Sequence, residues 1–333
     1  MDTMKAWTTD LERHSVRPGR KPVPQEGADE VLVRVLACAV CRTDLHVVDG
    51  ELAPHRAAVI PGHQIVGTVV RLGSAVRGLQ VGDLVGIAWL RRTCGACRWC
   101  RSGRENLCPD SQYTGWDADG GFAEYATVPA AFTYQLAERS DPVETAPLLC
   151  AGIIGYRALS RAALPPGGRL GIYGFGSSAH ITAQLALAAG AEVFAMTRGE
   201  PNRELARQLG ASFVGGAEAA PPAPLDSAII FAPAGTLVPI ALLATARGGT
   251  VVLAGIHVST IPALEYDSTL FYERDLRSVT SNTRGDGQEF LRIAHNLRIA
   301  PQVTRYPFDR VDRALDDLRS GSASGSLVID LTS

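Results

Sequence analysis

Four cysteines lie within fifteen residues of one another, in the spacing C-x2-C-x2-C-x7-C. Four thiolates this close together can surround one zinc ion tetrahedrally, which leaves no position open for a substrate. Such a zinc ion stabilises the fold of a lobe and does no chemistry of its own. Disulfides are the alternative, but an odd total of seven cysteines favours a reduced, intracellular protein. We therefore predict a structural zinc site at Cys94, Cys97, Cys100 and Cys108.

Two further cysteines and one histidine predict a second metal site. His63 follows Cys41 by 22 residues, and Cys150 comes much later in the chain. Two cysteines and one histidine are the three protein ligands of a catalytic zinc, which keeps its fourth position for water or substrate. Taken singly, each residue has an ordinary explanation. A lone cysteine such as Cys38 is usually a small buried hydrophobe, and a lone histidine is usually a satisfied surface or core residue.

A glycine-rich turn predicts a nucleotide-binding site. Residues Gly174-Phe175-Gly176-Ser177-Ser178-Ala179 have the form G-x-G-x-x-G/A. The two glycines permit a tight turn and the close approach of a pyrophosphate, and the N-terminus of the next helix supplies N–H donors. The motif alone is weak, because such glycine patterns often arise by chance. Its position between a predicted strand and a predicted helix favours dinucleotide binding.

The end of the following predicted strand indicates which dinucleotide is bound. An NAD site places a carboxylate there, which accepts hydrogen bonds from the adenosine ribose. This strand instead ends at Thr197 and Arg198, and Arg203 comes a turn later. A guanidinium can pair with a 2′-phosphate, so we predict NADP(H) over NAD(H). The alternative is that Arg198 is only a solvated loop residue.

The composition is that of an ordinary globular protein with a small-molecule partner. A chain of 333 residues usually forms two domains, and the net charge of −2 offers no basic field for nucleic acid or anionic lipid. Residues 227–246 carry no charge, but Pro233, Gly235 and Pro239 interrupt them, so we expect no membrane span. The N-terminus has no apolar signal core, which predicts a cytoplasmic protein.

The residue pattern changes along the chain, from a β-rich first part to an α/β second part. Short β-branched runs with glycine and proline between them predict strands in the first part. From about residue 165, strands and helices alternate, which predicts a doubly wound parallel sheet. Strands are expected at 31–36, 65–70, 81–87, 122–128, 169–173, 191–196, 227–232, 250–254, 276–281 and 326–331, and a late helix at 311–319.

The sequence resembles the zinc-dependent alcohol dehydrogenases of the medium-chain dehydrogenase/reductase superfamily, bacterial branch, over essentially its whole length. This resemblance implies a GroES-like catalytic domain at 1–152 and 291–333 with two zinc ions, and a Rossmann domain at 153–290. It also implies a homodimer or a homotetramer. The matching segments are Cys41-Arg-Thr-Asp-Leu-His46, Pro61-Gly-His63, the four-cysteine lobe, Gly120-Gly-Phe-Ala-Glu-Tyr125, Ala146-Pro-Leu-Leu-Cys150-Ala-Gly152 and Gly174-Phe-Gly176.

The resemblance also implies roles for the residues around the predicted catalytic zinc. Asp44 would orient His63, and Arg42 would contact the cofactor pyrophosphate. Thr43 and His46 would carry the proton of the alcohol to solvent by way of a cofactor ribose hydroxyl, while hydride passes to the nicotinamide. The substrate is then an alcohol or, in reverse, an aldehyde or ketone.

Three positions depart from the usual family pattern. Gln64 stands where a glutamate usually follows the zinc histidine, so the site loses a nearby negative charge. Thr197-Arg198 replaces the acidic NAD signature. Near the C-terminus, Gly325-Ser326-Leu327 lacks the arginine that many relatives direct at the pyrophosphate.

Similarity of position also predicts the walls of a substrate pocket, at Leu52, Trp89 and Trp116, with Ile256 near the nicotinamide. Two tryptophans on an aliphatic wall favour an apolar or aromatic substrate, although they could equally be core packing.

Two other functions remain open from the sequence. One is a zinc-free quinone or enoyl reductase of the same fold, which the presence of the three predicted zinc ligands disfavours. The other is a non-catalytic zinc- or redox-binding protein, which the intact Thr43 and His46 disfavour.

Overall fold

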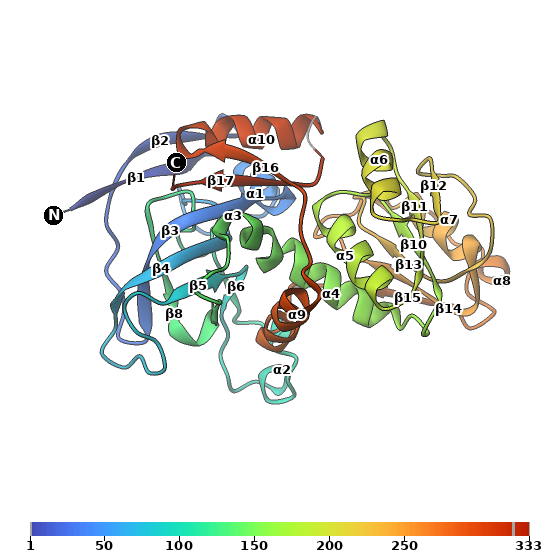
Figure 1. Ribbon diagram of the computed structural model, residues 1–333, viewed down its shortest axis with the longest axis horizontal. Coiled ribbons are helices and arrows are strands. Elements are labelled where there is room, and N and C mark those ends of the chain that lie inside the picture. The colour runs from blue at the N-terminus through green and yellow to red at the C-terminus, as the bar shows by residue number, and fades with distance from the viewer. Residues whose placement is uncertain (1, 322–323, 333) are drawn as a thin grey trace. The chain divides into compact units, whose positions relative to one another are not determined.

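The computed structural model describes residues 2–321 and 324–332 and divides the chain into two compact units. Unit 1 comprises Met1–Cys150, Ser281–Gln288 and Gln302–Ser333, and unit 2 comprises Ala151–Thr280 and Glu289–Pro301 (Figure 1). Residues 281–288, predicted from the sequence for the Rossmann domain, group with unit 1, whereas residues 151–152 and 291–301, predicted for the catalytic domain, group with unit 2. The chain crosses between the units four times, and the crossing between Gln288 and Glu289 falls within the helix α9 (Arg284–Leu297).

Unit 1 is built on a seven-stranded mixed sheet that contains the predicted strands of both ends of the chain. The late strand β17 pairs with β3 in antiparallel fashion, so the C-terminal tail completes the first sheet. Valines and isoleucines dominate β3 and β4, and their side chains form the core of the unit. The sheet has the order β16-β17-β3-β4-β5-β9, with β8 also on β3: β3 (Glu30–Val40), β4 (Gln64–Leu72), β5 (Leu84–Ile87), β8 (Tyr125–Pro129), β9 (Thr133–Gln135), β16 (Val303–Pro307) and β17 (Ser326–Asp330).

Two predicted strands of unit 1 are shorter than expected. The strand predicted at 81–87 begins only at Leu84, because Gly82 has a positive φ and Val81 is exposed in the preceding turn. The strand predicted at 122–128 begins at Tyr125, because Ala123 instead makes an isolated bridge with Ala6.

The remaining elements of unit 1 surround this sheet. A hairpin that the sequence analysis did not predict precedes the sheet and is followed by short helices and strands. The late helix lies where it was predicted. These elements are β1 (Thr3–Asp10), β2 (Ser15–Pro22), α1 (Arg42–Val48), β6 (Leu90–Arg92), α2 (Arg98–Arg101), η1 (Glu105–Leu107), β7 (Gln112–Tyr113), η2 (Ala130–Phe132), α3 (Pro142–Thr145), η3 (Ala146–Leu149), η4 (Phe308–Arg310) and α10 (Val311–Ser320).

Unit 2 contains a six-stranded parallel sheet in the order β12-β11-β10-β13-β14-β15. Numbered from its own first strand, this is the order 3-2-1-4-5-6 of a Rossmann fold. The strands are β10 (Arg169–Tyr173), β11 (Glu192–Met196), β12 (Phe213–Gly215), β13 (Leu225–Ile230), β14 (Thr245–Leu253) and β15 (Asp275–Ser278). The helices are α4 (Ala151–Ala162), α5 (Ser177–Ala188), α6 (Glu200–Gln208), α7 (Leu237–Ala244) and α8 (Tyr266–Thr269), together with the later part of α9.

The uncharged stretch at 227–246 forms most of a strand and a helix. β13 ends at Ile230, and α7 starts at Leu237 after the turn that contains Pro233 and Gly235. Among the described residues, the helices are all too short or too polar to cross a bilayer.

Candidate metal and cofactor sites

The three predicted ligands of the catalytic zinc meet at one end of the neighbouring strands β3 and β4 in unit 1. Ala39 of β3 pairs with Gln64 of β4, so Cys41, two residues after Ala39, and His63, one residue before Gln64, leave the sheet at the same end. Cys150 reaches this point from the end of η3. One ligand atom from each of the three side chains lies within 4.8 Å of the other two.

Asp44 holds His63 in the orientation that a metal ligand needs. Its carboxylate accepts hydrogen bonds from the backbone N–H groups of Cys41 (2.8 Å) and Gly62 (3.1 Å). His63 Nδ1 lies 3.0 Å from Asp44 Oδ1, so Nδ1 carries the donated proton and Nε2 is directed at Cys41 Sγ, 3.4 Å away. A carboxylate on the far ring nitrogen fixes the tautomer of a metal-binding histidine in this way.

The charges of this cluster favour a bound cation. The hydrogen bond from Cys150 holds the pKa of the Cys41 thiol well below its usual value, and the same contact raises the pKa of Cys150. Burial opposes the charged form of His63, but Asp44 and Cys41 outweigh it and raise the His63 pKa to about 10. A thiolate and a carboxylate thus draw positive charge onto the imidazole between them. Two sulfurs and one imidazole form a donor set suited to zinc.

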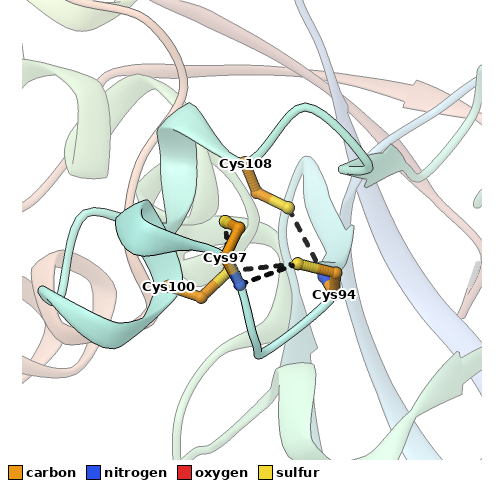
Figure 2. Close-up of side chains that lie close together, drawn as sticks. All are labelled: Cys94, Cys97, Cys100 and Cys108. Atoms are coloured by element: carbon orange, nitrogen blue, oxygen red, sulfur yellow. Dashed lines mark hydrogen bonds between the residues drawn. The ribbon is translucent and has the colours of Figure 1, made fainter.

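The four cysteines of the predicted structural site also converge (Figure 2). Their sulfur atoms lie within 4.8 Å of one another. The Sγ atoms of Cys97 and Cys100 are 3.5 Å apart and those of Cys94 and Cys100 are 4.0 Å apart, well beyond a disulfide bond. The backbone N–H groups of Cys94 and Cys97 donate to the sulfurs of Cys108 and Cys94, at 3.4 and 3.3 Å. Four converging sulfurs with N–H donors fit a closed tetrahedral zinc site.

The residues of the predicted proton relay lie on α1, and an acidic residue follows them. Thr43 and His46 are both buried, whereas Arg42 at the start of the helix is exposed. His46 Nδ1 donates a hydrogen bond to the carboxylate of Glu51, whose side chain is 53% exposed. Glu51 was not among the residues predicted from the sequence. The signal was an acidic residue five positions after His46, just beyond the C-terminal turn of α1.

The predicted pocket residues share one apolar cluster. Leu52, Trp89 and Trp116 pack together with Val47, Val59 and Tyr113. The Trp89 ring is edge-on to His63, with 5.0 Å between ring centroids, so this tryptophan packs against the catalytic cluster itself. Leu52 and Trp116 also line a small hollow that is partly open to solvent.

Gln64 is buried beside the catalytic cluster with an unsatisfied side chain. It is 1% exposed, and neither atom of its amide has a hydrogen-bond partner among the described residues. A carboxylate here would add a negative charge to a site that already holds Cys41 and Asp44. The amide keeps the shape of a glutamate without this charge.

The glycine turn lies between β10 and α5, as predicted. Gly174 has φ of +85°, and a Cβ atom there would come within 2.9 Å of the Ala232 nitrogen, so only glycine fits. Gly176 is the N-cap of α5 and offers no capping side chain to the first turn, which contains Ser177 and Ser178. The buried Phe175 donates its backbone N–H to Thr197 Oγ1 (3.2 Å), which ties the turn to the end of β11.

The two predicted cofactor arginines differ in their partners. Arg198, two residues after the end of β11, is exposed and makes no ion pair with any described residue. Arg203 lies on α6 and is 3.3 Å from the carboxylate of Glu200. Arg198 is therefore the better candidate to contact a 2′-phosphate. Ile256, also in unit 2, is half exposed.

A buried histidine next to the glycine turn predicts loss of stability in acid. Burial lowers the pKa of His180 from 6.5 to about 4. The unfolded chain takes up this proton near pH 6.5 but the folded chain does so only near pH 4. Above pH 6.5 this histidine therefore does not reduce the free energy of unfolding. As the pH drops from 6.5 to 4, the free energy of unfolding falls by about 3 kcal/mol. Urea unfolding at several pH values should show a smaller loss across this interval for His180→Gln than for the parent. Equal losses would contradict the prediction.

Comparison with known proteins places the chain in a family. Residues 27–138 match the family model of the alcohol dehydrogenase GroES-like domain. The chain is 55% identical to the protein named "Probable alcohol dehydrogenase AdhA" of Mycobacterium tuberculosis (strain CDC 1551 / Oshkosh), over 98% of this chain and 97% of the relative. Among solved structures, it is similar to a cinnamyl alcohol dehydrogenase of Sorghum bicolor, with TM-score 0.90, 28% identity and coverage of 99% and 98%. A cobalt- and zinc-bound alcohol dehydrogenase of Pyrobaculum aerophilum gives TM-score 0.89, 28% identity and coverage of 99% and 100%.

The chain belongs to the alcohol dehydrogenases of the medium-chain dehydrogenase/reductase superfamily. It is an oxidoreductase that interconverts an alcohol and an aldehyde or ketone, with zinc and a nicotinamide cofactor. The predicted family and fold class are confirmed, and the quinone reductase and non-catalytic alternatives find no support.

Proposed function

We propose that this enzyme holds two zinc ions per subunit, one catalytic and one structural. Cys41, His63 and Cys150 are the catalytic ligands, and the lobe of Cys94, Cys97, Cys100 and Cys108 holds the structural ion. The observation that carries the proposal is the convergence of these two sets of side chains on two points of unit 1. A zinc ion with three protein ligands supplies Lewis acidity to the oxygen of the substrate.

The residues of α1 handle the proton of the alcohol. The Thr43 hydroxyl takes up the proton of the substrate and passes it toward His46. In a neutral imidazole that donates its Nδ1–H to Glu51, Nε2 is the accepting nitrogen, so His46 would receive the proton there. Because Glu51 is exposed, its carboxylate gives the relay an exit to water. Asp44 keeps His63 in place throughout and stays outside the proton path.

The preferred cofactor is NADP(H). The turn at Gly174 and Gly176 and the first turn of α5 bind the pyrophosphate through backbone N–H groups. Arg198, which has no acidic partner in the part of the chain that the structure describes, is at the position where an NAD enzyme places a carboxylate. Arg203, held by Glu200, has a minor part.

The substrate side of the pocket is apolar. Leu52 and Trp116 line a small hollow in unit 1 and pack in one cluster with Trp89, whose ring contacts His63. Ile256 is assigned to the nicotinamide. Such a wall favours an aromatic or other apolar alcohol over a short polar one. We also propose a homodimer or homotetramer, as is usual in this family, and a cytoplasmic location, because none of the seven described cysteines is in a disulfide.

Metal analysis combined with steady-state kinetics tests the proposal. Purified enzyme should contain two zinc ions per subunit, and chelation that removes one of them should abolish reduction of benzaldehyde by NADPH. Benzaldehyde should be reduced with a higher kcat/KM than acetaldehyde. A fully active preparation with only one metal ion per subunit would contradict the assignment of the two sites.

A further inference from the structure

We propose that the four-cysteine lobe has a second task beyond its own folding: through Glu105 it fixes the first turn of α9, the helix within which the chain passes from unit 1 to unit 2. Glu105 and Arg284 are then positioning residues. They connect the four-cysteine lobe to the start of α9, which lies in the same unit. This inference rests on the proposed structural zinc only for its last step, the dependence of the clamp on metal.

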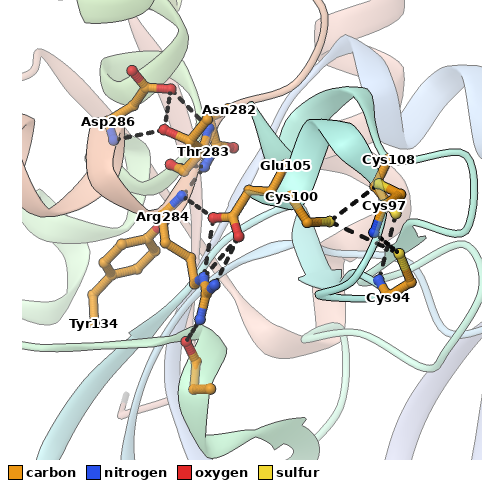
Figure 3. Close-up of polar contacts among 11 residues, drawn as sticks. Cys94, Cys97, Cys100, Glu105, Cys108, Tyr134, Asn282, Thr283, Arg284 and Asp286 are labelled. Atoms are coloured by element: carbon orange, nitrogen blue, oxygen red, sulfur yellow. Dashed lines mark hydrogen bonds and ion pairs between the residues drawn. The ribbon is translucent and has the colours of Figure 1, made fainter. Parts of the chain in front are cut away.

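The contact between the lobe and α9 is a multiple, charge-assisted one (Figure 3). Glu105 lies in η1, between Cys100 and Cys108, and is 7% exposed. Its Oε1 accepts hydrogen bonds from the backbone N–H (2.8 Å) and the Nε (3.0 Å) of Arg284, and its Oε2 accepts one from Arg284 Nη2 (2.7 Å). The carboxylate thus binds both the side chain and the backbone of the first residue of α9, 179 positions away in the chain.

A second set of contacts seats the same turn on unit 1. Arg284 lies over the Phe132 ring, 4.6 Å from its centroid. Gly287 packs so closely on Tyr134 that an added Cβ would lie 2.4 Å from its ring. Asp286 accepts hydrogen bonds from the backbone N–H and the hydroxyl of Thr283, at 2.7 and 2.8 Å. The start of α9 is therefore held at several points, of which the Glu105 contact is the ionic one.

The partners of Glu105 explain why the lobe must keep its shape. Burial of a carboxylate is costly unless it is paired. Arg284 provides that pair and keeps the pKa of Glu105 below its usual value despite the burial. The backbone N–H of Cys108 donates to the Glu105 carbonyl (3.0 Å), so the position of η1 follows that of the cysteine. Opening of the lobe would move η1 and separate the ion pair.

The consequence concerns the stability of the start of α9. Without the clamp, residues 284–288 lose charge-assisted hydrogen bonds that hold them on the rest of unit 1, so this turn should open more often.

Hydrogen exchange measured on the full-length enzyme tests the clamp directly. In Glu105→Gln, amide exchange of residues 284–288 should be about ten- to a hundredfold faster than in the parent, since the lost bonds are charge-assisted. The zinc content should be unchanged. Arg284→Lys keeps the charge but loses the paired N–H donors of the guanidinium, so it should give the same result. Amide exchange of residues 284–288 in the double variant should be no faster than in either single variant.

Zinc depletion separates the clamp from the metal assignment. Removal of zinc from the parent should speed exchange at 284–288, whereas in Glu105→Gln it should add nothing there. Glu289→Gln, which breaks the exposed Glu289–Arg292 pair on the same helix, is the matched control and should leave exchange at 284–288 unchanged. Exchange in Glu105→Gln equal to that of the parent would overturn the clamp. Metal analysis of the parent showing no zinc in the lobe would overturn the structural zinc while leaving the clamp to stand on the variants alone.

Discussion

The variant Cys150→Ala should lose about a thousandfold or more in kcat and retain only one zinc ion per subunit. Loss of one of three protein ligands removes the metal from the catalytic cluster, and Lewis-acid stabilisation of the reacting oxygen is worth several kcal/mol, with about 1.4 kcal/mol for each factor of ten in rate. The structural zinc should remain, because its four sulfurs form a separate group. Zinc content and benzaldehyde reduction, measured on the same preparation, check both parts.

A matched control exists in the buried cysteine that the proposed site does not use. Cys38 is fully buried in the core of unit 1 and donates only to the Ala39 carbonyl, at a long 3.7 Å. Cys38→Ala should therefore keep both zinc ions and most of the activity. If Cys38→Ala lost the metal as Cys150→Ala does, or if Cys150→Ala kept two zinc ions, the ligand assignment would be wrong.

The sequence predicts those parts of the fold in which a clear hydrophobic pattern marks each element. The strand at 169–173 and the glycine turn after it lie where they were predicted, because a buried strand followed by a helix has a strong signal. The hairpin β1–β2 was missed, since Ser15–Pro22 is mostly exposed and includes Pro18 and Gly19. The three residues of β12 are too few for any periodicity.

The candidate site could be predicted for its motifs but not for its tertiary contacts. Cys41 and His63 converge because β3 and β4 are antiparallel neighbours, a pairing that family resemblance supplies and spacing alone does not. The ion pair of Glu105 with Arg284 joins positions 179 residues apart, and no local pattern marks either residue. Glu51 is only five residues after His46 in the sequence. The two side chains meet because the chain turns back after α1, which no local pattern predicts.

Arg198→Ala should lower kcat/KM for NADPH about ten- to hundredfold and leave kcat/KM for NADH nearly unchanged. A guanidinium paired with a phosphate makes charge-assisted hydrogen bonds, each worth about 1.5–3 kcal/mol. Arg198 has no competing acidic partner among the described residues, so its charge is available to the 2′-phosphate. NADH lacks the 2′-phosphate, so the substitution should not weaken its binding.

The specificity of this effect can be judged against a neighbouring arginine on α6. Arg207 is exposed and already bound to Glu200 (2.7 Å) and Glu204 (3.1 Å), so Arg207→Ala should change neither cofactor's kcat/KM. High salt should weaken binding of NADPH more than that of NADH in the parent, and this difference should vanish in Arg198→Ala. A parent enzyme that uses NADH with the higher kcat/KM would show that Arg198 is only a solvated loop residue, and the absence of a carboxylate after β11 would then carry no information about the cofactor.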